Sequence, residues 1–145
     1  MTNEREPAPR IQTQVQVMFF DTDSGGVVHN IAYLRFVEIA RTLLAEKLGM
    51  KLVEMAETRQ YPVVVRTEID YRRAAKLGDH LRIEGWLDQL DRVRFWCGFQ
   101  IRLIGDETLI AECRQMLALI QMPEAKLLRL PQSWERYRVV ESERG

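Results

Sequence analysis

Apolar and polar residues alternate between residues 11 and 20. Val15, Val17 and Phe19 point one way, and Gln14, Gln16 and Met18 point the other. A period of two predicts a β-strand. Residues 1–10 are polar, carry two prolines and are expected to form a flexible tail.

The period then changes to that of a helix. From residue 30 to residue 48, apolar residues recur three or four positions apart, at Tyr33, Val37, Ala40, Leu44 and Leu48. Asn30 is the expected N-cap and Gly49 the expected C-terminal stop. We predict one long helix, about 27 Å by its rise per residue, and a short helical piece at 52–58.

Four further segments are rich in β-branched and aromatic residues, which favours strands. They are residues 63–73, 80–90, 93–104 and 108–120. Turn-forming pairs such as Gly78-Asp79 and Gly105-Asp106 separate them at intervals typical of hairpins. The predicted order is strand, long helix, four strands.

This order predicts an α+β domain over residues 11–132, with residues 133–145 as a C-terminal extension containing a short charged helix. One helix can cover one face of a five-stranded sheet if the sheet curls around it. The other face and the edges of the sheet must then be covered by a partner subunit, so we expect a homodimer or homotetramer.

Composition narrows the class of protein. The 145 residues are 46% hydrophobic and 29% charged, with a formal net charge of zero. A neutral chain argues against binding to nucleic acid or to anionic membrane through global charge. No secretory signal and no apolar run of roughly 20 residues is present, so the cytoplasm is the expected location. Cys97 and Cys113 are expected to be buried thiols, with a disulfide or redox pair as the alternative.

Familiar catalytic templates are absent from the sequence. It has no G-x-S-x-G elbow, no G-x-G-x-x-G and no P-loop. Its two histidines, His29 and His80, have no Cys or His at metal-ligand spacing, so no metal site is expected. Any chemistry must then come from the turn at residues 21–30.

That turn combines carboxylates, glycines and a helix start. A helix N-terminus has unpaired N–H groups that polarise a carbonyl and hold an oxyanion. Gly25 and Gly26 permit close approach of a ligand, and a carboxylate such as Asp23 can attack the carbonyl or activate water. A thioester suits this arrangement, because its thiol leaves readily as thiolate. The competing interpretation is that Asp21 and Asp23 simply cap the helix or form Asx turns.

The stretch from Phe20 to Glu38, FDTDSGGVVHNIAYLRFVE, resembles the signature of the 4-hydroxybenzoyl-CoA thioesterase family. That family includes the Tol-Pal-associated acyl-CoA thioesterases. Similarity extends over roughly residues 12–132 and includes Leu77-Gly78-Asp79, Ile110-Ala111-Glu112 and Leu130-Pro131. The resemblance implies a hotdog fold, in which a curled antiparallel sheet surrounds the long helix and dimers form edge to edge.

The resemblance also assigns roles to single residues. Asp23 matches the catalytic carboxylate, and the backbone N–H of Asn30 matches the group that polarises the thioester carbonyl. Glu38 falls where a relative touches the distal acyl group, and Arg92 and Arg94 fall near a segment that meets the phosphates of CoA. Substrate contacts are also expected at Gly26, His29 and Tyr33.

Several of these positions have a purely structural alternative. Glu38 can pair with Arg35 or Arg41 along the helix, and Tyr33 can serve packing alone. Two departures from the family pattern stand out: Asn replaces a frequent His at position 30, and the basic triplet reads Asp91-Arg92-Val93. A second basic segment comprises Arg72, Arg73 and Lys76. Two interpretations of it stay open: these side chains bind phosphate, or they only keep the end of a strand solvated.

The hypothesis is therefore hydrolysis of acyl-CoA to acid and CoA, with Asp23 as nucleophile or general base. No cofactor is implied, because CoA is part of the substrate. Two alternatives stay open, a thioesterase acting on acyl-carrier protein and a non-catalytic module that binds acyl-CoA.

Overall fold

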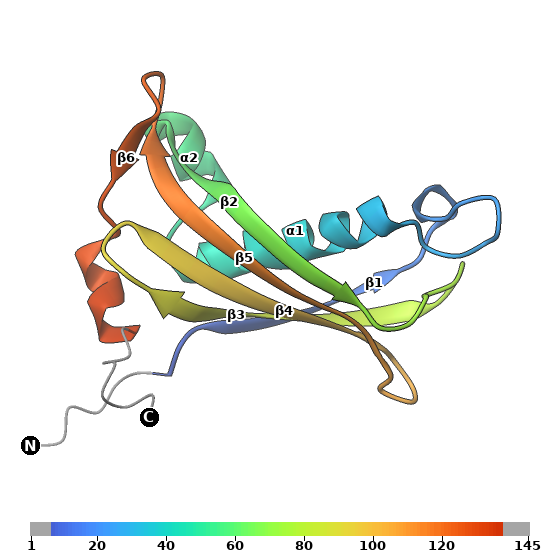
Figure 1. Cartoon of the computed structure of the whole chain (residues 1–145). Coiled ribbons are helices and arrows are strands. Elements are labelled where there is room, and N and C mark those ends of the chain that lie inside the picture. Colours follow the sequence, from blue (N-terminus) through green and yellow to red (C-terminus); the bar gives the residue numbers. More distant parts are fainter. Residues whose placement is uncertain (1–6, 138–145) are drawn as a thin grey trace, which may run out of the picture.

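One long helix lies in the concave side of a curled antiparallel sheet (Figure 1). The structure, a computed structural model, describes residues 7–137. The elements in chain order are β1 (Arg10–Gln16), η1 (Phe19–Asp21), α1 (Asn30–Lys47), α2 (Leu52–Thr58), β2 (Gln60–Tyr71), β3 (His80–Leu90), β4 (Arg94–Leu103), β5 (Leu109–Gln121), β6 (Lys126–Leu128) and η2 (Gln132–Tyr137).

The strands follow the order β1-β3-β4-β5-β2, and the short β6 pairs with β5. The expected α+β architecture, a curled sheet around one long helix, is confirmed, and β6 adds a sixth strand to the five predicted. β2 begins at Gln60, three residues before the predicted start, and contains a bulge between Val64 and Arg66. Pro62 is tolerated there because β2 is an edge strand in this chain.

The core lies between α1 and the concave face of the sheet. The helix packs chiefly against β3 and β1. Its inward stripe includes Phe36, Val37 and Ala40, each with no exposed surface, and these meet inward-facing residues such as Ile83 and Phe99. Each large apolar side chain buried in this way stabilises the fold by about 1.5–3 kcal/mol. The helix is therefore held by its apolar stripe.

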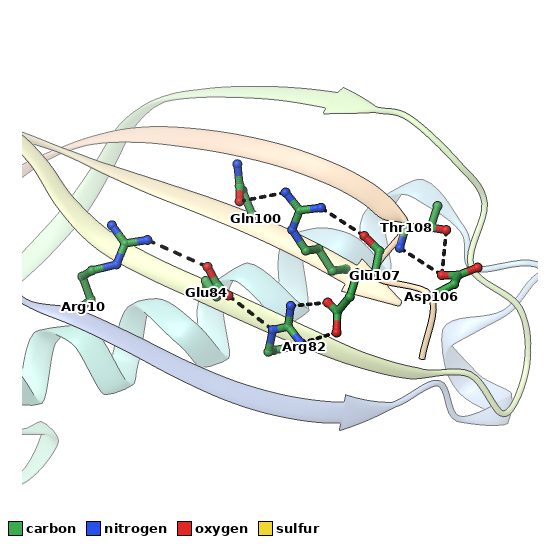
Figure 2. A network of polar contacts seen from close by, with 8 residues as sticks. Arg10, Arg82, Glu84, Gln100, Asp106, Glu107 and Thr108 are labelled. Atoms are coloured by element: carbon green, nitrogen blue, oxygen red, sulfur yellow. Dashed lines mark hydrogen bonds and ion pairs between the residues drawn. The ribbon is translucent and has the colours of Figure 1, made fainter. Parts of the chain in front are cut away.

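The convex face of the sheet carries a network of charged side chains (Figure 2). Glu84 lies 3.8 Å from Arg10 and 3.3 Å from Arg82, and Arg82 also pairs with Glu107. The outward-facing Trp86 lies beneath the Arg10 guanidinium, 4.8 Å from it. These ion pairs make this part of the convex face polar.

The predicted first strand ends early. β1 stops at Gln16, and Phe19 and Phe20 lie in η1 with 81% and 68% of their surface exposed. The prediction that Phe19 continues the apolar side of the strand is therefore wrong. The Asp21 carboxylate accepts the Met18 N–H at 2.9 Å, which turns the chain out of the strand direction.

The last described segment, η2, packs into the core. Trp134 is 1% exposed, its ring lies 5.1 Å from that of Phe95, and its indole N–H donates to the Leu48 carbonyl at 3.0 Å. This contact adds residues beyond 132, where we expected the domain to end. At the other terminus β1 already includes Arg10. Most of the expected tail and extension, residues 1–6 and 138–145, lies outside the described residues.

Both cysteines are buried and free, so the expectation of buried thiols is confirmed and the disulfide alternative is wrong. Burial raises the pKa of Cys97 and of Cys113 to about 12, although the positive charge of Arg41 acts in the opposite direction on both. A thiol with this pKa has almost no thiolate at neutral pH. Neither cysteine is therefore suited to act as a nucleophile.

We expect both thiols of the native protein to resist a thiol-reactive disulfide reagent at neutral pH. In denaturant, where burial is lost and the pKa returns to its ordinary range, both react. Absorbance of the released thiolate measures the two rates. Rapid labelling of the folded protein would contradict the burial described here.

Candidate active site

The two carboxylates of the turn before α1 have different environments. Asp21 is 1% exposed. Its Oδ1 accepts a hydrogen bond from Arg35 Nη2 at 2.6 Å, and its Oδ2 accepts the Met18 N–H at 2.9 Å. Its carbonyl accepts the His29 N–H at 3.0 Å. Asp21 is thus a structural anchor that joins the end of β1, the turn and the helix.

Asp23, in contrast, is exposed. Its Oδ1 accepts the Gly25 N–H at 2.8 Å, and its backbone N–H donates to the Val27 carbonyl at 2.9 Å. Among residues 7–137, no side chain or amide donates to its second carboxylate oxygen. Gly26 closes the turn with a φ of +75°, a conformation that suits glycine. The turn therefore presents one free carboxylate oxygen to solvent.

His29, rather than Asn30, is the N-cap of α1. His29 has extended backbone angles, and its Nδ1 accepts the Ala32 N–H at 3.1 Å. Asn30 is the first helical residue, so the expectation that Asn30 caps the helix is wrong by one position. As the first residue of the helix, Asn30 has an N–H without an intrahelical acceptor. This amide lies at the positive end of the helix dipole.

Two tyrosines support this end of the helix. Tyr33 is 3% exposed, and its hydroxyl oxygen accepts the Ala75 N–H at 3.0 Å. Burial raises the pKa of Tyr33. Tyr71, at the end of β2, packs against it and donates to the Asn30 carbonyl at 3.3 Å. Sequence reasoning missed Tyr71, although an aromatic residue at the end of an edge strand was a usable signal.

The connection between β2 and β3 packs directly on the turn. The Val28 N–H donates to the Ala75 carbonyl at 2.9 Å, and the Leu77 N–H donates to the Gly26 carbonyl at 3.0 Å. Arg73 and Lys76 of this connection are exposed. Of the basic residues considered for phosphate binding, Lys76 lies beside the turn, where it pairs with Val27, whereas Arg72 and Arg73 donate their backbone N–H groups to the Ile110 carbonyl.

Arg92 and Arg94 lie elsewhere, at the β3–β4 hairpin. The Arg92 carbonyl accepts the Leu130 N–H at 2.9 Å, close to η2 and the C-terminal end of α1. Figure 1 shows this hairpin at the opposite end of the helix from the 21–29 turn. Within one chain, the structure does not bring these arginines together with Asp23.

Glu38 lies on the exposed side of α1, with 65% of its side chain accessible. Its Oε1 is 3.8 Å from Arg41 Nη2, a weak i,i+3 ion pair. The sequence-predicted site thus divides into three places. Asp23, Gly26, His29, Asn30 and Tyr33 meet at the start of α1, Glu38 lies further along the helix, and Arg92 and Arg94 lie at its far end.

Within residues 7–137, no three His, Cys, Asp or Glu side chains gather in a way that would hold a metal ion. No described helix has the length and apolar character needed to cross a membrane.

Comparison with known proteins identifies the family. A family model described as the thioesterase-like superfamily matches residues 17–136. The chain belongs to the thioesterase-like superfamily. The acyl-CoA thioesterase YbgC of Haemophilus influenzae is 32% identical to this chain over 118 residues, which cover 81% of this chain and 85% of the relative. A 1,4-dihydroxy-2-naphthoyl-CoA hydrolase of Synechocystis is 30% identical over 122 residues, covering 83% and 88%.

Solved structures of thioesterases share the fold. The crystal structure of Slr0204, a 1,4-dihydroxy-2-naphthoyl-CoA thioesterase from Synechocystis, matches with a TM-score of 0.79 and 25% identity over 89% of this chain and 95% of that one. A probable thioesterase from Bartonella henselae matches with a TM-score of 0.75 and 28% identity over 85% and 100%. The hotdog fold and membership of a thioesterase family, both expected from the sequence, are confirmed.

The different environments of the two aspartates lead to a test. We expect Asp21→Asn to lower the free energy of unfolding by roughly 1–2 kcal/mol, because it removes the charge from a buried carboxylate that accepts a hydrogen bond from the partly exposed Arg35. The matched variant Asp23→Asn keeps an oxygen that accepts the Gly25 N–H, so its loss should stay within about 0.5 kcal/mol. Urea unfolding measures both. Equal stability of the two variants would show that Asp21 is no anchor.

Proposed function

We propose that this protein hydrolyses acyl-CoA thioesters to a carboxylic acid and CoA. The observation that carries the proposal is the pairing of an exposed carboxylate, Asp23, with the unpaired amide of Asn30 at one end of α1, in a chain of the thioesterase-like superfamily. The names of the relatives support the substrate class, since they act on acyl-CoA or on 1,4-dihydroxy-2-naphthoyl-CoA.

In the proposed reaction the thioester carbonyl oxygen accepts the Asn30 N–H. The helix end then stabilises the negative charge that develops on this oxygen. Asp23 either attacks the carbonyl carbon, forming a mixed anhydride that water then hydrolyses to free the acid and Asp23, or removes a proton from the water that attacks the carbonyl carbon directly. The C–S bond breaks and CoA leaves as thiolate, since a thiol with a pKa near about 8.5 needs no strong acid. The two roles of Asp23 stay as alternatives.

The CoA portion would follow the basic residues at the same end of the molecule. Lys76 is exposed beside the turn, Arg73 is exposed on the same connection, and phosphate groups suit such side chains. Arg92 and Arg94 would reach this site only from a second copy of the chain. A homodimer or homotetramer is therefore part of the proposal.

The edge strand β2 supports such an assembly. It pairs on one side with β5, and Val64 and Val65 on it are 41% and 51% exposed. A long edge strand with exposed apolar residues is usually covered by a partner. The free thiols suit a reducing compartment, which supports the cytoplasm as the proposed location.

We expect thiol release from a panel of short, long and aromatic acyl-CoAs by the wild-type protein, and a fall of at least about 100-fold in kcat for Asp23→Asn. The variant removes the charge of Asp23 but preserves the Asx turn, so we expect it to fold like the wild-type protein. An unchanged unfolding curve of the variant is therefore the control. Unchanged turnover in Asp23→Asn would refute the role of this residue. Turnover of acyl-carrier protein but not of acyl-CoA would instead favour the carrier-protein alternative.

The amide of Asn30 can be tested separately. Proline is well accepted as the first residue of a helix, and the preceding His29 has extended angles compatible with it. Asn30→Pro thus removes the N–H with little cost to the helix, whereas Asn30→Ala keeps it. We expect kcat to fall by about 100- to 1000-fold in the proline variant, and far less in the alanine variant. Equal activities would mean that the oxyanion is held elsewhere.

A further inference from the structure

β1 is the edge of the sheet opposite β2, and one side of its backbone is largely unpaired. The Pro9 carbonyl and both backbone groups of Val17 bond toward β3 and the connection before it. Because backbone groups alternate in direction along a strand, the odd-numbered residues face β3 and the even-numbered residues of β1 face away. Gln12, Gln14 and Gln16 therefore present N–H and C=O groups to the open edge, and no residue within 7–137 bonds to these groups.

This edge lacks the features that normally keep an edge strand from pairing. Native proteins protect such edges with lysine, proline, other charged side chains or β-bulges. From Ile11 to Gln16 the sequence reads IQTQVQ, without charge or proline, and its register with β3 has no bulge. The other edge strand, β2, carries both Pro62 and a bulge after Val64. β1 is therefore suited to accept a further extended chain through backbone hydrogen bonds.

A groove of about 830 Å³ lies between this edge and the C-terminal half of α1. Arg10 and Ile11 of β1 form one wall of the groove. Leu43 and Lys47, which are about one helical turn apart on α1, form the other wall, and Lys51 borders the groove beyond the end of the helix. The groove thus offers space for those side chains of an added strand that point toward α1.

The cations of the groove indicate the charge of its occupant. Lys47 and Lys51 are exposed, and among residues 7–137 no carboxylate lies within ion-pair distance of either. Lys47 instead donates to the Arg10 carbonyl at 2.7 Å, on the open side of the strand. Of the two carboxylates that border the groove, Glu84 already lies 3.8 Å from the Arg10 guanidinium, which leaves only Glu46. An acidic occupant would supply the missing partners of the two lysines.

A second copy of this chain would not supply that charge. Pairing through its own β1 would bring the segment RIQTQVQ, which contains no carboxylate, so Lys47 and Lys51 would stay unpaired. Self-pairing at β1 in addition to β2 would also extend the sheet at both edges, and contacts of this kind that do not close produce open chains of subunits. These two points favour a different polypeptide as the occupant.

We propose that β1 is a docking site for an extended acidic segment of a partner protein, which adds to the sheet as a further strand. The backbone of this segment pairs with Gln12, Gln14 and Gln16. Carboxylates among its side chains on the α1 side bind Lys47 and Lys51. The inference goes beyond the proposed hydrolysis of acyl-CoA and does not depend on it.

The test uses fluorescent peptides that match the seven residues of β1 in length and in which valine alternates with glutamate or with lysine. The full-length protein is titrated into each peptide, and fluorescence anisotropy measures binding. We expect saturable binding of the glutamate peptide that weakens with added salt, and binding of the lysine peptide that is at least about 10-fold weaker. N-methylation of one alternate set of backbone amides abolishes binding and methylation of the other set does not, because a strand presents every second residue to its neighbour.

Variants of β1 test the edge itself. Gln14→Pro removes an N–H that faces the open edge and leaves the bonds to β3 in place, and proline is tolerated at such positions. Gln14→Ala keeps this N–H and is the matched control. We expect the proline variant to bind the glutamate peptide about 10-fold more weakly, and the alanine variant to bind it like the wild-type protein. Lys47→Gln combined with Lys51→Gln weakens binding and reduces its dependence on salt. Urea unfolding curves show whether each variant is folded.

Several results would overturn the inference. One is the absence of saturable binding at about 1 mM protein, and another is an equal effect of the two methylated sets. Full binding by a folded Gln14→Pro variant would place the peptide elsewhere on the molecule. If light scattering without peptide shows a smaller assembly for Gln14→Pro than for Gln14→Ala, β1 pairs with a second copy of the chain and the partner protein is refuted. Hydrolysis of acyl-CoA enters none of these measurements, so the proposed function is judged separately.

Discussion

An ion pair between the buried Asp21 and the partly exposed Arg35 is the constraint on which the site depends. Arg35 belongs to α1, and the second oxygen of Asp21 holds the amide that ends the first strand. A carboxylate removed from water is costly unless it is paired and hydrogen-bonded, so the turn has little freedom to rearrange. This rigidity allows the neighbouring Asp23 to remain exposed and yet well placed beside the helix.

Much of the fold could be predicted from periodicity, because burial imposes it. The apolar stripe of α1 and the alternation in β3 to β5 follow from packing helix against sheet. The errors arose where a side chain overrides the local pattern. Phe19 continues an alternating run, but the Asp21 carboxylate bends the chain there. Asn30 is the better N-cap by propensity, yet the imidazole of His29 takes that place.

The part of the candidate site that lies in one turn was predictable from the sequence, whereas the contacts that distant strands make with it were not. The turn is local in sequence, so the motif already joins Asp23 to the helix start. Contacts over long sequence separation leave no such signal. Tyr71 reaches the Asn30 carbonyl from β2. The position of Arg92 and Arg94 at the far end of α1 likewise follows from strand topology, which no motif contains.

The contact between Trp134 and the Leu48 carbonyl has a consequence for biosynthesis. It joins positions 86 residues apart and completes the C-terminal end of the helix. During translation, α1 therefore leaves the ribosome long before Trp134 is synthesised. Until η2 emerges, the aromatic face of Phe95 and the last turn of α1 lack their cover. The domain reaches its final packing only when translation has passed its last described segment, so the nascent chain spends most of its synthesis with part of the core open.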